Sequence, residues 1–290
     1  MRNPVDRMYE EAARRLMETG YSEQAVAGAH VRPVWEDGTP AMTRYLPQQV
    51  FRYKPGLVPL TNYRKTAWKT AIKELLWIYK DKSNDVNLLR DRYHVKYWDS
   101  WKNEEGTLGT AYGYQVGKKF LSPETGEETD QISRLIQTLR EDPLNRRIMM
   151  SLIDMDDLHA MTLIPCAFLT LWTVTEDRLN MTLVQRSGDF LAAASPGGIN
   201  SFQYYALLCM VARVTGYRPG QFVHFIENLH IYDRHEEIVR EVLKAEVEQA
   251  PRPRLLLNPS VKEFEDFTID DFQLEDYRPD GRKYRIPIAL

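Results

Sequence analysis

The sequence predicts an α+β fold in which a single domain spans residues 1–290. Segments with helical periodicity and segments with strand composition follow one another without the regular strand–helix alternation of a parallel α/β protein. With 290 residues, of which 43% are hydrophobic and 27% are charged, the chain is long enough to bury a sizeable core. No internal repeat or low-complexity tract divides it.

Four segments have the spacing of apolar residues that is typical of helices. They are residues 4–19, 65–80, 131–141 and 201–215. Gly20 and Gly216 directly follow the first and the last of these segments, where glycine commonly ends a helix. The polar residues 81–91 are predicted to be a loop.

Segments rich in β-branched and aromatic residues predict the strands. They are residues 147–153, 166–174, 179–185 and 222–227, with further strands and loops within 28–64. Residues 175–178 are a predicted hairpin turn, which would pair the second and third of these strands. Such pairing would bring Cys166 and Arg186, at the strand ends far from the turn, close together.

The composition argues against several other classes of protein. The net charge of -3 gives no general surface for nucleic acid, so we expect no DNA partner. Cys166 and Cys209 are too few for a disulfide framework and match no metal-binding pattern, so we expect no metal. No signal peptide is visible, and no apolar run approaches the ~20 residues of a membrane span. We therefore expect a cytoplasmic protein without a membrane partner.

Cys166 is the candidate nucleophile. It follows Pro165 at the start of a predicted strand, in LIPCAFLTLW, where a side chain can be exposed at the mouth of a sheet. A nucleophilic cysteine needs nearby positive charge to favour its thiolate, and Arg186 could supply it. Taken alone, the segment favours a buried hydrophobic thiol instead.

Two basic segments are candidates for binding an anion. The QRSGD segment supplies a guanidinium, a hydroxyl and a carboxylate through Arg186, Ser187 and Asp189, a set that suits a phosphorylated ligand. Taken alone, it is also typical of a solvated turn. The adjacent Arg146 and Arg147 form the second candidate, although paired arginines are more often plain surface charge.

Several other polar residues are candidates for a functional role, although a structural role would also explain their positions. His230 and Tyr232 alternate in a strand-like segment and therefore face the same side, where they could bind a ligand hydroxyl. His230 and His235 lack a third ligand at metal-binding spacing, so zinc is rejected. Glu74 lies in an apolar helical segment, as a candidate acid or base or as the polar edge of the helix.

Taken together, these segments resemble the thymidylate synthase family over nearly the whole chain. The matching segments, in the family's order, are KTAIKELLWI, YWDSWKNEEGTLGTAYGYQ, NRRIMMSLI, Pro165–Cys166, QRSGD, NSFQYYALL, HIYDRH and the C-terminal PIAL. The resemblance implies a single-domain thymidylate synthase-like fold. In this fold, helices flank a mixed β-sheet that is used for dimerisation.

The resemblance also implies an activity, the reductive methylation of dUMP to dTMP by a methyltransferase. The co-substrate 5,10-methylenetetrahydrofolate would donate both the carbon and the hydride, without a metal. Cys166 resembles the nucleophile that attacks C6 of the pyrimidine, which makes C5 reactive toward the one-carbon unit. Glu74 resembles the carboxylate that organises water and proton transfer, Tyr112 the tyrosine near the C5 proton, and Arg186 the positive neighbour of the thiol.

Binding roles follow from the same resemblance. Arg186 and Ser187 resemble phosphate ligands, and Arg146 and Arg147 resemble a pair that reaches the partner's nucleotide across a homodimer with shared active sites. The resemblance also implies contacts to the base, the sugar and the folate. Asn200 would contact the uracil edge, and His230 and Tyr232 would contact the deoxyribose hydroxyl. The folate side would be formed by Trp98, Trp101, Asp189 and Ala289 of the tail. Asp189 would also contribute to binding the substrate.

The chain departs from the family pattern at several places. They are Gly38 in place of an early phosphate-loop arginine, Ala167 in place of a histidine, a longer loop at 190–199, and Glu227–Asn228 in place of a Gly–Asp pair. Arg32 or Arg44 are the candidates to replace the missing arginine. The altered loop would border both the folate and the pyrimidine.

Two alternatives to the synthase remain. The first is a pyrimidine-nucleotide hydroxymethylase of the same superfamily, in which the altered loop admits water that takes the place of the hydride. Asn200 favours uracil over cytosine, because an amide matches the uracil edge, and the PIAL tail favours the synthase by excluding water. The second alternative is a non-catalytic nucleotide- or RNA-binding relative, against which the retention of Cys166 and its neighbours argues.

Overall fold

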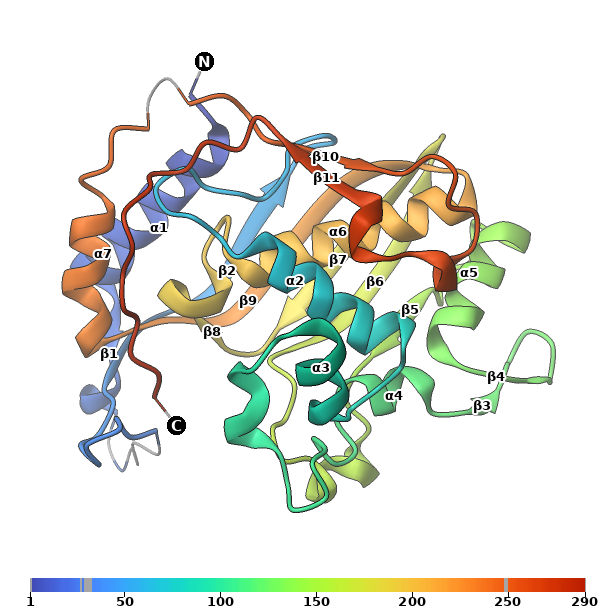
Figure 1. Cartoon of the computed structure of the whole chain (residues 1–290), viewed down its shortest axis with the longest axis horizontal. Coiled ribbons are helices and arrows are strands. Elements are labelled where there is room, and N and C mark those ends of the chain that lie inside the picture. Colours follow the sequence, from blue (N-terminus) through green and yellow to red (C-terminus); the bar gives the residue numbers. More distant parts are fainter. Residues whose placement is uncertain (1, 27, 29–32, 248–249, 290) are drawn as a thin grey trace.

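A mixed β-sheet lies at the centre of the protein (Figure 1). The structure is a computed structural model that describes residues 2–26, 28, 33–247 and 250–289. Within these residues the sheet has seven strands, in the order β1-β2-β9-β7-β6-β5, with β8 paired to β9. Strand β9 runs parallel to β7 and β8, and the other neighbours are antiparallel. The predicted α+β class is therefore confirmed.

The strands of the sheet are β1 (Tyr21–Ser22), β2 (Thr43–Tyr53), β5 (Met149–Ser151), β6 (Ala167–Thr175), β7 (Arg178–Gln185), β8 (Gly188–Asp189) and β9 (Arg218–Tyr232). Two small hairpins lie outside it, β3 (Phe120–Leu121) with β4 (Glu128–Thr129), and β10 (Arg254–Leu257) with β11 (Phe272–Glu275). The helices are α1 (Pro4–Thr19), α2 (Trp68–Leu75), α3 (Val86–Tyr93), α4 (Gly113–Gly117), α5 (Gln131–Glu141), α6 (Ile199–Thr215) and α7 (Glu236–Val242).

Helices α2 and α6 pack together over one face of the sheet (Figure 1). Helix α6 is apolar nearly all round, and almost all of its side chains are buried, as expected of a helix enclosed within a core. The main core lies between these helices and the sheet and includes Trp77, Trp172, Phe202 and Phe222. This layer places the N-terminal end of α6 beside the ends of β7 and β8.

A second core lies where α1 and α7 meet the other end of the sheet (Figure 1). Tyr9, Phe190 and Val239 are buried in it. Asn3 caps α1 by accepting a bond from the amide of Val5 at 3.1 Å. The ring of Phe190 packs against that of Tyr9 with centroids 4.9 Å apart, so the segment after β8 is part of this core.

Several sequence-based boundaries were wrong. The loop expected at 81–91 is wrong from residue 86 onward, where α3 begins, because Asp85 caps the helix and Val86, Leu89 and Tyr93 supply one buried face. The strand expected at 222–227 extends over the whole of β9. The helix expected from residue 65 begins at Trp68, and its final turn, Leu76–Lys80, is a π-helix. Helices α1 and α5 and the β6–β7 hairpin agree with the predictions.

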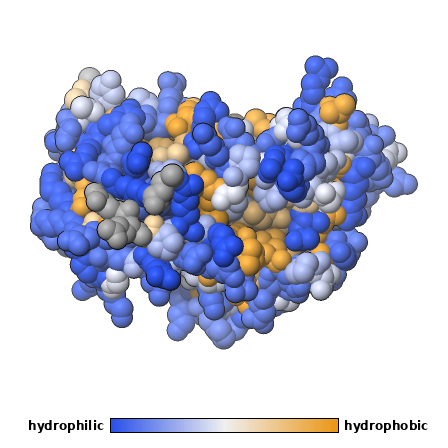
Figure 2. All heavy atoms as spheres, turned by 90° about the horizontal axis from the view of Figure 1, so that it is seen from above, coloured by the Kyte–Doolittle hydropathy of each residue, from blue (hydrophilic) through white to orange (hydrophobic). Residues whose placement is uncertain are grey.

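The face of the sheet opposite α2 and α6 is apolar and partly exposed. The strand register places Leu169, Val184, Phe225 and Val50 side by side across four consecutive strands. On the same face Leu171 is 41% exposed and Val50 is 44% exposed. Figure 2 shows the molecule from above, where the surface is mostly hydrophilic and hydrophobic side chains appear at several places, with the largest group near the centre of the view.

Candidate active site

The β6–β7 hairpin brings Cys166 and Arg186 together, as predicted. Cys166 directly precedes β6, Arg186 directly follows β7, and the amide of Arg186 donates to the carbonyl of Cys166 at 2.9 Å. Nη2 of Arg186 lies 3.7 Å from Sγ of Cys166. The guanidinium of Arg186 therefore lies beside the thiol of Cys166. Of the two cysteines in the described residues, Cys166 is partly exposed and Cys209 is buried.

The arginine is held in place by the chain that precedes the cysteine. Its Nε donates to the carbonyl of Pro165 at 3.1 Å and its Nη2 to the carbonyl of Ile164 at 2.7 Å. Burial raises the pKa of the Cys166 thiol, and the charge of Arg186 opposes that rise. The amount of reactive thiolate therefore depends on this one arginine.

Glu74 is a buried carboxyl without a counter-ion among the described residues. It lies on α2 at 5% exposure, and it accepts bonds from Nε1 of Trp98 at 2.8 Å and from Nε2 of Gln203 at 2.9 Å. Burial raises the pKa of Glu74, although both hydrogen bonds act to lower it. Such a carboxyl is suited to holding and passing on a proton.

Tyr112 completes the buried polar group near the thiol. Its ring packs edge-on against Trp98 with centroids 4.9 Å apart. Burial and the nearby Cys166 and Glu74 raise the pKa of the Tyr112 phenol well above its ordinary value, so it stays protonated. The φ of Tyr112 is 53°, an uncommon backbone conformation for a residue other than glycine.

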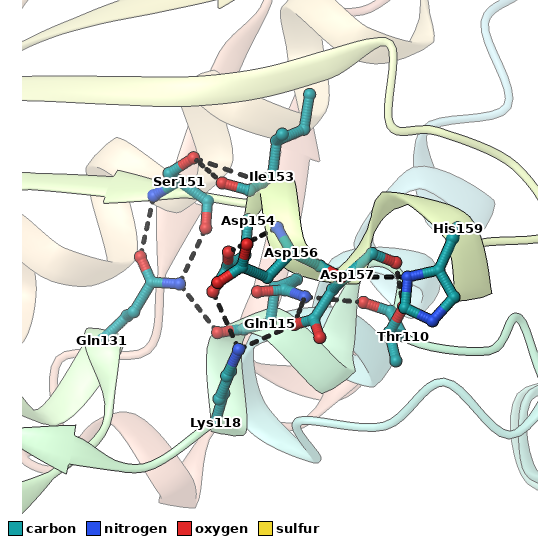
Figure 3. A network of polar contacts seen from close by, with 10 residues as sticks. All are labelled: Thr110, Gln115, Lys118, Gln131, Ser151, Ile153, Asp154, Asp156, Asp157 and His159. Carbon is teal, nitrogen blue, oxygen red and sulfur yellow. Dashed lines mark hydrogen bonds and ion pairs between the residues drawn. The ribbon is translucent and has the colours of Figure 1, made fainter.

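A polar network fixes the backbone that carries Tyr112 (Figure 3). Lys118, just after α4, binds Asp154 at 2.8 Å and Asp157 at 2.7 Å. Gln115 donates to Asp157 at 2.8 Å, and Gln131 donates to the carbonyl of Gln115 at 2.7 Å. Together these bonds tie α4, which directly follows Tyr112, to α5 and to the segment after β5.

Asn200 lies in the first turn of α6, with its side chain directed to β7. Gly198 is the N-cap, so the amide of Asn200 is not used as a cap. Nε2 of Gln185 donates to Oδ1 of Asn200 at 3.1 Å and to the carbonyl of Ser187 at 2.8 Å. No sequence pattern predicted the role of Gln185, because the contact joins β7 to a helix that follows a long loop.

His230 and Tyr232 share one side of β9, as their alternation predicted. Their rings pack edge-on with centroids 5.2 Å apart. Nδ1 of His230 lies 3.0 Å from Oδ1 of Asn228, so the unexpected residue of the Glu227–Asn228 pair orients the imidazole. Burial lowers the pKa of His230 despite the opposing charge of Asp189, which leaves a neutral ring.

Asp189 organises the longer loop. Its Oδ1 accepts bonds from the amides of Leu191 at 2.9 Å and Ala192 at 3.1 Å, which caps a π-helix at Phe190–Ala194. Burial raises the pKa of Asp189, but His235 outweighs this effect, so the net shift is downward and the carboxylate is charged. Because Phe190 is fully buried, the loop is part of the second core.

His235 links Asp189 to the C-terminal tail, and two tryptophans pack together elsewhere in the structure. His235 lies 3.5 Å from Asp189, and its Nε2 lies 2.8 Å from the carbonyl of Pro287. Trp98 and Trp101 pack edge-on with centroids 5.7 Å apart, which forms an aromatic wall suited to a planar ring. Ala289, near the end of the tail, is half-buried.

Other candidates are not joined to this group. Arg146 and Arg147 are exposed between α5 and β5, and their side chains have no hydrogen-bond or ion-pair partner among the described residues. Arg44 forms an ion pair with Glu236 at 3.2 Å, and Arg32 lies outside the described residues. Ser187 is half-buried and contributes its carbonyl to Gln185.

The described residues contain no cluster of three or more histidines, cysteines, aspartates or glutamates arranged for a metal ion. In the same part of the chain, no helix has both the length and the apolar character needed to cross a membrane.

The fold and this group of residues define a class of enzyme. A thiol beside a fixed arginine, with a buried carboxyl and a protonated phenol nearby, suits covalent attack on an electrophilic carbon with proton transfers around it. Both protonatable groups are shielded from water, which is typical of chemistry in a closed site.

Comparison with known proteins identifies the family. The family model described as thymidylate synthase matches residues 7–290. The chain is 41% identical over 286 residues to thymidylate synthase of Bacillus licheniformis, covering 98% of this chain and 99% of the relative. It is 42% identical over 286 residues, with the same coverage, to thymidylate synthase 1 of Bacillus subtilis strain 168.

A solved structure agrees with these relatives. The thermostable thymidylate synthase A from Bacillus subtilis superposes with a TM-score of 0.90 at 40% identity, over 98% of this chain and 99% of that one. The chain belongs to the thymidylate synthase family. The predicted family, its fold and the methyltransferase class are therefore confirmed.

Proposed function

We propose that this chain, as one catalytic domain over residues 1–290, converts dUMP to dTMP by reductive methylation. The co-substrate is 5,10-methylenetetrahydrofolate, which supplies both the carbon and the hydride. Relatives named thymidylate synthase, matched over 98% of the chain, support this reaction, and they do not favour the hydroxymethylase alternative. The observation that carries the proposal is the 3.7 Å contact between Arg186 and the thiol of Cys166.

The proposed chemical roles follow from the contacts. The thiolate of Cys166 attacks C6 of the pyrimidine, and Arg186 stabilises the negative charge on sulfur before the attack. Glu74, with its raised pKa, holds a proton and relays it through water to the base. Tyr112 keeps its phenolic proton and orients the water or base that removes the C5 proton.

The proposed binding roles use the rim of the same site. Arg186 and Ser187 bind the phosphate from one side, and Arg146 and Arg147 of a second subunit bind it from the other. The remaining groups hold the nucleoside. Asn200 bonds the uracil edge, and His230 and Tyr232, oriented by Asn228, bond the deoxyribose hydroxyl.

The folate side is proposed to be formed by Trp98, Trp101, Asp189 and the tail around Ala289. The aromatic wall offers a face on which a pterin can stack. Asp189 is charged and already bound to the backbone, so it presents its remaining lone pairs without having to reorganise. The tail is anchored beside it through His235, which suits a segment that excludes water from the reaction.

We infer a homodimer formed through the uncovered face of the sheet, with active sites shared between the subunits. The row of apolar residues on this face, including the partly exposed Leu171 and Val50, is a surface that association would bury. Arg146 and Arg147 support the shared site, because they have no partner within the described residues of their own chain. A cytoplasmic setting suits the two free cysteines.

Product analysis tests the reaction. The protein is incubated with dUMP and 5,10-methylenetetrahydrofolate, and the products are analysed by mass spectrometry, with a mixture lacking the folate as control. We expect dTMP together with dihydrofolate. A hydroxymethylated nucleotide would establish the hydroxymethylase instead, and the absence of any product would favour a non-catalytic nucleotide- or RNA-binding protein.

A further inference from the structure

A chain of buried polar side chains connects the core of the sheet to Asn200. His224 on β9 is fully buried, and its Nε2 lies 2.8 Å from Oε1 of Gln185. On its other side, Nδ1 lies 3.0 Å from Oγ of Ser201. Gln185 in turn binds Asn200 at 3.1 Å. The proposed reaction gives no role to His224, Gln185 or Ser201.

We propose that His224 and Gln185 are positioning residues that hold the Asn200 amide in one of its two orientations and thereby strengthen the preference for uracil over cytosine. The inference rests on the proposed function, in which Asn200 meets the pyrimidine edge. It extends base selection to two residues that touch no ligand.

The carbonyl of Ser187 determines the orientation of Gln185. A carbonyl oxygen only accepts, so the nitrogen of the Gln185 amide must face it, as it does at 2.8 Å. Oε1 of Gln185 then faces Nε2 of His224 and requires a donor there. His224 must therefore carry its proton on Nε2. Nδ1 is then an acceptor for the hydroxyl of Ser201, whose oxygen also lies 3.2 Å from the carbonyl of Ser195.

Burial keeps His224 in that form. Its side chain is enclosed in the core, and burial lowers the pKa of His224 to about 3, so the ring is neutral at physiological pH. A neutral imidazole has one donor and one acceptor, which matches the two partners it has here. If Gln185 flipped, its amide nitrogen would face the Nε2 proton of His224 and its oxygen would face the Ser187 carbonyl, leaving buried polar groups unpaired.

The fixed Gln185 then determines the orientation of Asn200. The second N–H of Gln185 points at Asn200, so Oδ1 must face it and Nδ2 must lie on the opposite side. A flipped Asn200 would place its own N–H groups against those of Gln185. The order of acceptor and donor that Asn200 presents to a ligand is therefore set from the core of the protein.

This order matters because uracil and cytosine present their hydrogen-bond donors and acceptors in opposite order. Uracil presents an acceptor at O4 and a donor at N3, whereas cytosine presents a donor at N4 and an acceptor at N3. An amide that turned freely would serve either base after a flip. An amide fixed by Gln185 serves one base and leaves the other with unmatched donors and acceptors.

The proton position on His224 gives a direct test in the wild-type protein. Long-range proton–nitrogen NMR correlation of the imidazole identifies the tautomer independently of catalysis. We expect the neutral ring with its proton on Nε2 at neutral pH. A neutral ring with its proton on Nδ1 would overturn the proposal, because Nε2 would then be an acceptor and Gln185 would be free to flip.

Binding selectivity gives the second test. Calorimetry measures Kd for dUMP and for dCMP with wild type, His224→Phe and His224→Gln. We expect His224→Phe to lower the dUMP preference by about tenfold, because the amide of Gln185 loses its fixed orientation. His224→Gln should restore most of the preference, since its own amide can be a donor near the position of Nε2.

A matched control and a second variant guard against general damage. Phe222 lies two residues before His224 on the same face of β9, with ring centroids 6.1 Å apart. Phe222→Leu should therefore lower stability but leave the dUMP preference unchanged. Gln185→Met removes both the donor to Asn200 and the acceptor for His224 while leaving the imidazole in the core. It should reproduce the effect of His224→Phe, which keeps the test available if one variant does not fold.

The outcomes separate this inference from the proposed function. If wild type forms no dTMP, the proposed function fails. If wild type forms dTMP and Asn200→Asp changes base preference while folded His224→Phe and Gln185→Met do not, only the positioning role fails. A loss of preference in Phe222→Leu equal to that in His224→Phe would also refute the positioning role.

Discussion

Arginines lie both at the end of the β6–β7 hairpin and in the segment between α5 and β5, but the two regions differ in how firmly they hold these side chains. Arg186 is fixed by two carbonyls of its own chain and faces the thiol of Cys166. Arg146 and Arg147 are exposed, and within the described residues nothing holds their side chains. One region is organised before any ligand or partner arrives, whereas the other is not.

This difference indicates which functions a single chain can perform. Activation of a thiol needs a charge at a fixed distance, and the hairpin supplies it because the two strands share one register. Long exposed arginines lose side-chain freedom when they bind, so a partner that orders them must provide strong contacts, such as a phosphate. We therefore expect variants of the hairpin to affect chemistry and variants of the other segment to affect assembly of the site.

Cys166→Ala gives the largest expected effect and tests the hairpin. Turnover should be abolished, because no other group in this position can form the bond to C6. Binding of dUMP should remain largely intact, since the proposed phosphate and base ligands are other residues, Arg186, Ser187 and Asn200 among them. Rapid-quench product analysis and calorimetry measure the two properties separately. Formation of dTMP by the variant would exclude Cys166 as the nucleophile.

Arg147→Ala tests the other region through subunit mixing. Alone, this variant and Cys166→Ala should both be inactive or nearly so. Their mixture should regain about one quarter of wild-type activity, because half of the dimers are hybrids and each hybrid has one intact site. The exposed Arg7 on α1 provides the matched control, since Arg7→Ala should stay active by itself. No recovery after confirmed subunit exchange would contradict the shared site.

Asn200→Asp tests how the pre-organised region selects its base. The carboxylate still accepts from Gln185, but it repels O4 of uracil and attracts the N4 amine of cytosine. Activity on dUMP should fall, and the kcat/KM for dCMP relative to dUMP should rise. Helix capping is not affected, because Gly198 occupies the N-cap. An unchanged preference in a folded variant would mean that another residue reads the base.

The sequence predicted those parts of the site that depend on local structure. Cys166 and Arg186 meet because a short hairpin joins their strands, and His230 and Tyr232 share a side because strand residues alternate. Helix α3 escaped prediction because Val86, Leu89 and Tyr93 supply its only buried face within a polar stretch. The helical spacing of these three residues could have predicted the helix.

Contacts between distant segments carried no such signal. His224 looked like any residue of a strand, and its pairing with Gln185 exists only because β7 and β9 are parallel neighbours in the sheet. The role of Asn228 beside His230 and the capping of Phe190–Ala194 by Asp189 likewise depend on the folded structure. Departures from the family pattern marked Asn228 and the loop at 190–199 without indicating what they do, whereas no departure marked His224 or Gln185.

Cys209 offers the smallest expected effect and sharpens the comparison, because it is a thiol without a neighbouring arginine. It is buried on α6, and burial raises the pKa of Cys209 to about 12, so it stays protonated and inert at neutral pH. Cys209→Ala should lower the free energy of unfolding by ~1–2 kcal/mol and leave turnover unchanged. Denaturant unfolding measures the first quantity and dTMP formation the second. In the native protein, alkylation should label Cys166 before Cys209, because Cys166 is partly exposed and lies beside a positive charge, whereas Cys209 is buried. The opposite order of labelling would show that Arg186 does not activate the thiol it contacts.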